Sequence, residues 1–130
     1  MNQKTTKLLY RISTGLLTAL MLMSATMYFA QYEMVSEVFT KLGYPTYIIY
    51  PLAIAKYLGL IAIWTNFSPK LKEWAYAGFF FDILLAMSAH VNINDGEFIP
   101  SSIGLLLVLT SYYFNRKLEK ENNQAEVPVA

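Results

Sequence analysis

Cysteine is absent from the 130-residue chain, and histidine occurs only once, as His90. Without cysteine, the chain cannot form disulfides, thiolate zinc sites, iron–sulfur clusters or c-type haem attachments. The single histidine excludes bis-histidine haem within one chain, and no second imidazole can complete a metal site. The sequence therefore predicts no metal and no evident cofactor of these classes.

Excess charge of one sign is also missing, because ten basic and nine acidic residues leave a formal charge of +1. This balance gives no electrostatic footprint for nucleic acid, so we predict no nucleic-acid partner. Apolar residues, in contrast, make up 55% of the chain. That share exceeds the usual range of a soluble domain and indicates the lipid bilayer as a partner.

Long apolar runs define four candidate membrane spans. Residues 12–30 and 98–115 contain no charge, and a span needs ~20 mostly apolar residues. Two further runs contain isolated ionisable residues at mid-length. We therefore predict an all-α, polytopic membrane four-helix bundle over residues 1–117, followed by a polar tail over 118–130 that stays helical for about one turn before fraying. The predicted spans are about 8–30, 46–67, 72–93 and 98–116.

Basic residues are distributed asymmetrically between the loops of this arrangement. One side of the predicted bundle has only Lys41. The opposite side has Lys4, Lys7, Arg11, Lys70, Lys72, Arg116, Lys117 and Lys120. Because cytoplasmic loops carry the excess of lysine and arginine, both termini are predicted to be cytoplasmic. A multi-pass protein of the cell membrane, as in a bacterial inner membrane, is the expected location.

The loop between the first two spans predicts a short amphipathic helix. Over residues 33–42, apolar side chains recur at helical spacing, with Glu33, Glu37 and Lys41 elsewhere. Gly43 and Pro45 then terminate the helix. Two interpretations stay open: a simple surface connector, or a lid over an interior site.

Lys56 and Asp82 lie near the middle of the second and third spans. A charge at that depth costs ~3 kcal/mol or more, so two opposite charges at matched depth predict a pair. His90 lies two turns beyond Asp82, closer to the outside. The pair is either a closed structural bridge or one wall of a polar pocket that includes His90.

Small residues predict which helix faces pack together, because they allow close approach inside membranes. On the third span this face is Ala75, Gly78, Asp82, Ala86 and Ala89. On the first span it is Gly15, Thr18, Ala19, Leu22 and Thr26. A second ion pair, between Arg11 and Glu73, is predicted at the inner boundary.

These features resemble the DoxX-like family of small four-helix membrane proteins, over roughly residues 8–115. The resemblance is carried by Leu42-Gly43-Tyr44-Pro45, Lys56 with Gly59, the segment 71–79, Asp82, and Ser88-Ala89-His90. The segment 91–97 departs from the His…Gly-Asp ending of the family. The resemblance implies the four-helix fold. It also implies kinship with subunits linked to quinol or thiosulfate oxidation, with members of oxidoreductase complexes, and with distant relatives in receptor assembly.

Three functions follow as hypotheses. The first is a non-catalytic subunit or assembly partner that binds a membrane protein or a second copy, because no nucleophile–base arrangement is visible. The second is a quinone-binding subunit of a membrane oxidoreductase complex, with polar contacts from Tyr57, Tyr76, Asp82 and His90. The third is a small proton-coupled carrier that uses Lys56 and Asp82, although carriers usually have more spans and a repeat.

Overall fold

The computed structural model describes residues 2–94, 96 and 98–126, with side chains to Gln124. Within these ranges, every element is helical. The elements are α1 (Gln3–Ala30), α2 (Tyr32–Leu42), the 3₁₀ turn η1 (Thr46–Ile48), α3 (Ile49–Thr65), α4 (Pro69–Ile93) and α5 (Phe98–Glu126).

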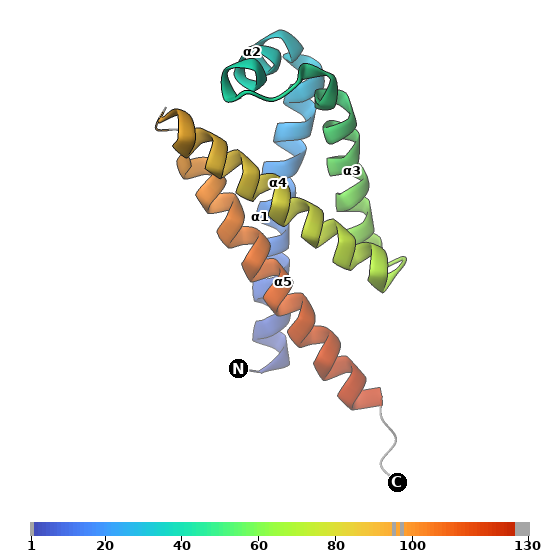
Figure 1. Cartoon of the computed structure of the whole chain (residues 1–130). Helices are drawn as coiled ribbons and strands as arrows, with labels where there is room; N and C mark the ends of the chain where they lie inside the picture. The colour runs from blue at the N-terminus through green and yellow to red at the C-terminus, as the bar shows by residue number, and fades with distance from the viewer. Residues whose placement is uncertain (1, 95, 97, 127–130) are drawn as a thin grey trace.

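Four segments of the described chain are long and apolar enough to cross a membrane, and they correspond to the four predicted spans. Their outward surfaces carry large exposed apolar side chains, such as Leu16, Leu58, Phe81 and Leu106. In a bilayer these side chains contact lipid, whereas patches of this extent are rare on soluble monomers. The start of α1 and the end of α5 lie at the same end of the bundle, opposite α2 (Figure 1). The predicted all-α membrane bundle is therefore confirmed.

Helix α5 is longer than predicted, because it continues to Glu126 instead of fraying soon after residue 117. Interactions along its surface explain the difference. Arg116 pairs with Glu119 one turn later at 3.3 Å, and such i,i+3 pairs stabilise helices. Gln3 Nε2 donates to Asn122 Oδ1 at 3.3 Å, which joins this extension to the start of α1. Residues 127–130 of the predicted tail lie outside the described part.

Helix α2 matches the amphipathic segment predicted from the loop sequence. It ends in a Schellman motif, in which Gly43 adopts φ 86° and the amides of Gly43 and Tyr44 bond to the carbonyls of Thr40 and Phe39. The Tyr44 ring also packs edge-on against Phe39, with centroids 6.1 Å apart. Glycine is required here because other residues avoid the left-handed region. The motif turns the chain back toward α3.

The long helices contact one another in the order α1, α3, α4, α5 and back to α1. Helices α3 and α4 meet near their short connection and diverge toward the opposite end, where α2 lies across the top of the bundle (Figure 1). The middle of the bundle is filled by buried apolar side chains, which we call the central apolar layer. Its members are Leu17, Met21, Leu60, Ile63, Phe79, Ile83 and Val108, and the ring of Tyr76 packs in the same cluster.

Gly59 marks a close contact between α3 and α4. We expect Gly59→Ala to lower the free energy of unfolding by about 1–3 kcal/mol, because overpacking a core has that cost. The new Cβ would lie 2.8 Å from Phe79 Cζ. Gly15→Ala is the matched control, since a Cβ there meets no heavy atom within 4 Å. Thermal unfolding of both variants in one detergent measures the difference, and equal melting temperatures would contradict the contact.

Candidate ligand-binding site

Lys56 lies inside the bundle, on the face of α3 that meets α1 and α4. Its side chain is 6% exposed. Its Nζ donates to Ser24 Oγ at 2.7 Å and to Tyr28 OH at 3.0 Å, both on α1. The ammonium group also lies 4.2 Å from the centroid of the Tyr28 ring. Neutral oxygens and a ring face of α1 therefore solvate most of this buried charge.

Asp82 supplies the counter-charge from α4. Lys56 Nζ lies 3.8 Å from Asp82 Oδ2, which is within ion-pair range but too long for a hydrogen bond. Among the described residues, Lys56 is the only polar partner of this carboxylate, whose side chain is 25% exposed. The two charges are thus brought together as predicted, but the carboxylate keeps free acceptor positions.

These acceptor positions matter because Asp82 lines three adjoining hollows. The largest, which we call the α2-capped cavity, has a volume of about 480 Å³ and lies between α2, α3 and α4. Helix α2 forms its roof with Met34, Val35, Val38, Phe39 and Leu42. Asp82 therefore lines these hollows in addition to pairing with Lys56.

The other two hollows adjoin the pair from different sides. The α3–α4 groove has a volume of about 360 Å³ and extends from Leu52 and Asp82 to Leu71 and Trp74. A smaller side cavity of about 160 Å³ lies between α1, α4 and α5, and Lys56 lines it with Asp82.

His90 also lines the α2-capped cavity. It follows Asp82 by eight residues, which corresponds to ~12 Å along α4. The cavity therefore has ionisable groups at two levels, Asp82 at its floor and His90 near its α2 end.

The two tyrosines predicted to join this site lie elsewhere. Tyr57 OH is hydrogen-bonded to Thr26 Oγ1 at 2.9 Å, on the side of α3 that faces α1. Tyr76 OH is hydrogen-bonded to Ser111 Oγ at 2.7 Å. Neither side chain lines the hollows around Asp82. Residues adjacent on a helix point ~100° apart, so Tyr57 cannot share the direction of Lys56.

Tyr76 belongs instead to a buried hydroxyl cluster nearer the chain termini. Ser111 Oγ lies 2.6 Å from Thr14 Oγ1 and 2.7 Å from Tyr76 OH, so one serine joins α1, α4 and α5. The central apolar layer separates this cluster from Lys56, because Leu17, Phe79 and their neighbours lie between the two levels. In the described part of the chain, mainly apolar side chains therefore lie between the polar groups around Lys56 and those around Ser111.

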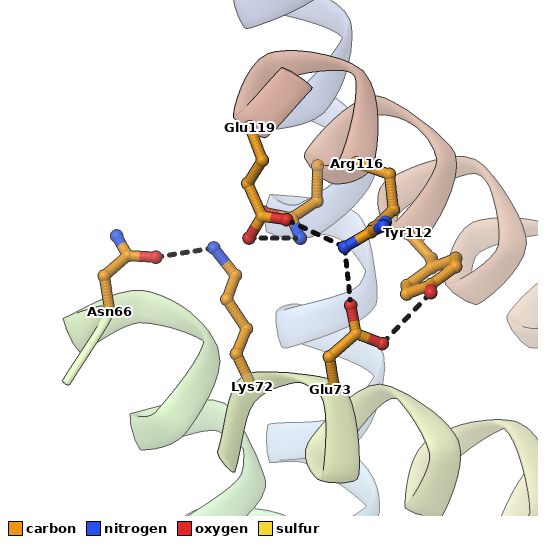
Figure 2. Close-up of polar contacts among 7 residues, drawn as sticks. Asn66, Lys72, Glu73, Tyr112, Arg116 and Glu119 are labelled. Carbon is orange, nitrogen blue, oxygen red and sulfur yellow. Dashed lines mark hydrogen bonds and ion pairs between the residues drawn. The ribbon is translucent and has the colours of Figure 1, made fainter. Parts of the chain in front are cut away.

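Glu73 has a different partner from the predicted one. Its carboxylate lies 3.4 Å from Arg116 Nη1 and accepts a hydrogen bond from Tyr112 OH at 3.0 Å, both on α5 (Figure 2). Arg11 is exposed on α1. The predicted Arg11–Glu73 pair is therefore wrong, because the face of α4 that carries Glu73 packs against α5. Nearby, Lys72 donates to Asn66 Oδ1 at 2.6 Å (Figure 2).

Both predicted small-residue faces need correction. On α1, Leu22 is 43% exposed, and the buried face is Thr14, Leu17, Met21 and Ala25 instead. This shift explains why sequence reasoning missed Ser24 and Tyr28 as partners of Lys56. On α4, Gly78 is exposed, and Gly78 and Ala86 line the hollows, whereas Ala75 lines a hollow and also packs against the buried core.

A family model, described as the DoxX-like family, matches residues 12–111. The chain belongs to the DoxX-like family. The matched region of this DoxX-like protein contains Lys56, Asp82 and His90, whereas Arg116 lies beyond it. No curated protein and no solved structure matches the chain. Among the described residues, no group of three His, Cys, Asp or Glu side chains is placed to hold a metal ion.

The Lys56–Asp82 pair can be tested by a double-mutant cycle in this DoxX-like protein. We expect Lys56→Met to lower the free energy of unfolding by about 3 kcal/mol, because it leaves a carboxylate at mid-membrane without its counter-charge. Adding Asp82→Leu should restore about 1 kcal/mol or more. Unfolding in mixed micelles measures the free energy of unfolding of the wild type, both single variants and the double variant. Simple addition of the two single effects would show that the charges are not coupled.

The hydroxyl cluster predicts a second stability effect. Ser111→Ala should lower the free energy of unfolding by about 1–3 kcal/mol, because it removes a hydrogen-bond partner from both Thr14 and Tyr76 inside the core. Ser102→Ala on the same helix is the matched control, since Ser102 Oγ donates mainly to Phe98 O of its own helix, at 2.9 Å. The same unfolding assay compares them, and similar losses would refute a special role for Ser111.

Proposed function

We propose that this DoxX-like protein is a non-catalytic membrane subunit that binds a neutral, hydroxyl-bearing amphiphile of the quinol type in the α2-capped cavity. The observation that carries the proposal is the Asp82 carboxylate, which stands at the floor of an apolar cavity and keeps free acceptor positions. The membrane we propose is a bacterial inner membrane, with both chain termini in the cytoplasm.

The charges at the cavity floor select the head group. An ionised Asp82 accepts hydrogen bonds and cannot donate them, so it favours a ligand with an O–H group. Lys56 already balances its charge, and an anionic head would be repelled by the carboxylate at low effective dielectric. An oxidised quinone presents only acceptors and matches Asp82 less well. A quinol is therefore the better ligand of the two redox forms.

The roof of the cavity supports the lid interpretation of α2. Five of its eleven residues line the cavity, and a connector alone would need none of them there. Most ligand pockets are apolar with a few placed polar groups, and this one has Asp82 and His90. Helix α2 would exclude water and so strengthen the hydrogen bond to Asp82.

The subunit role follows from the residue types of the chain. With no cysteine and one histidine, its own side chains offer no evident set of ligands for haem or an iron–sulfur cluster. Electrons exchanged with a bound quinol would therefore pass to a protein partner. The proton-coupled carrier is less well supported, because the central apolar layer interrupts the polar groups between the hydroxyl cluster and Lys56.

Redox preference tests the proposed ligand. We expect a short-chain hydroquinone to raise the melting temperature of the purified protein more than the matching quinone does. Asp82→Asn should weaken hydroquinone binding about tenfold, because a charge-assisted hydrogen bond becomes a neutral one, and 1.4 kcal/mol corresponds to that factor. The same variant should improve binding of the quinone, since the new amide can donate.

Glu73→Gln is the matched control for this measurement, because it neutralises an acid on the same helix outside the cavity. It should leave both melting-temperature shifts unchanged. If neither ligand shifts the wild-type protein, the proposed ligand class is wrong. If Glu73→Gln weakens binding as much as Asp82→Asn, the site is not at Asp82.

A further inference from the structure

The α2-capped cavity does not end at Asp82, because the α3–α4 groove continues from it. Leu52, Gly78 and Asp82 line both hollows. From Asp82, the groove extends along α4 to Leu71, eleven residues away, which corresponds to ~16 Å. This length is close to one leaflet, because the hydrocarbon core of a bilayer is ~30 Å thick.

The walls of the groove keep it open. Gly78 is exposed on α4, and a Cβ added there would meet no heavy atom within 4 Å, although α3 and α4 are in contact elsewhere along their length. Gly59, in contrast, is filled by the Phe79 ring on the neighbouring face. Ala55 and Ala62 of α3 and Ala75 of α4 complete the walls. The small residues thus leave a channel beside a tight contact.

Charge is confined to one end of the groove. Lys56 and Asp82 lie where it joins the cavity, and apolar side chains and Trp74 line the rest. This pattern fits a molecule with one polar end and one apolar chain. A phospholipid fits less well, because its charged head would lie beside Asp82 at mid-membrane and its second chain would have no channel.

We infer that the α3–α4 groove holds the single hydrocarbon tail of the ligand whose hydroxyl head binds Asp82, with the tail end beside Leu71 and Trp74. The inference rests on the proposed function for the position of the head. It adds the ligand class: a neutral amphiphile with one tail at least as long as the groove. Tails much shorter than one leaflet would leave the groove partly empty.

Photolabelling tests the placement of the tail. The probe is a hydroquinone whose single alkyl tail ends in a diazirine, added to the full-length protein in lipid nanodiscs. Peptide mass spectrometry should place the label on Ala62, Leu71 or Trp74, and excess unlabelled alkyl hydroquinone should remove it. Gly78→Leu should reduce this labelling at least about tenfold, since overfilling a packed site costs that much or more.

Two further variants keep the test decisive. Gly15→Leu also adds a side chain where a Cβ meets nothing, and Gly15 lines none of the hollows around Asp82. Photolabelling of the Gly15→Leu variant should equal that of the wild type. Ala62→Leu narrows the groove from α3 and should reproduce the loss seen with Gly78→Leu, which covers the case in which Gly78→Leu fails to fold.

The outcomes separate the two proposals. A tail-less hydroquinone should shift the melting temperature of Ala62→Leu as it does the wild type, because Ala62 lines the α3–α4 groove and not the α2-capped cavity that holds the head. If that shift occurs but the label falls on lipid-facing residues outside the groove, such as Leu16 or Leu106, or excess alkyl hydroquinone does not remove it, the groove assignment is wrong and the head site stands. If no hydroquinone shifts the wild type and labelling cannot be competed, both proposals are overturned.

Discussion

The buried ammonium group of Lys56 is the constraint on which the arrangement of the bundle depends. A charge at mid-membrane is tolerated only when other groups replace its water. Here Ser24 and Tyr28 of α1 provide hydrogen bonds, and Asp82 of α4 provides the opposite charge. One side chain of α3 therefore fixes the rotation of two neighbouring helices. Apolar packing alone would specify those rotations weakly, since lipid competes equally for apolar faces.

Polar groups are arranged in levels along the bundle axis. The hydroxyl cluster around Ser111 joins three helices near the chain termini, and Lys56 joins three helices at mid-depth. Between them, Leu17, Phe79 and Val108 belong to one buried cluster of apolar side chains, which also includes the ring of Tyr76. Each level orients a different set of helices. Helix α4 diverges from α3 toward the end of the bundle where α2 lies (Figure 1), and the α2-capped cavity is lined by residues of these three helices.

Sequence alone predicted the four spans, α2 and the Lys56–Asp82 pair, because length, apolar content and isolated charges are local signals. It did not predict which small residues face a neighbour and which face a hollow. Gly59 and Gly78 look alike in sequence, yet one receives the Phe79 ring and the other borders open space. The difference arises from the inclination of α4, which no local pattern records. The same inclination turns Glu73 toward Arg116 and away from Arg11.

The division of contacts around Lys56 has a consequence for ligand exchange. Both hydrogen bonds of the ammonium group go to α1, to Ser24 and Tyr28. Asp82, in contrast, lines the α2-capped cavity and keeps free acceptor positions. A ligand that binds to the free acceptor positions of Asp82 and later leaves them does not remove any hydrogen bond between α1 and α3. Ligand binding and release therefore leave the contacts between α1 and α3 unchanged. If hydrogen bonds from the protein had filled every acceptor position of the carboxylate, each ligand would have had to break native hydrogen bonds in order to bind.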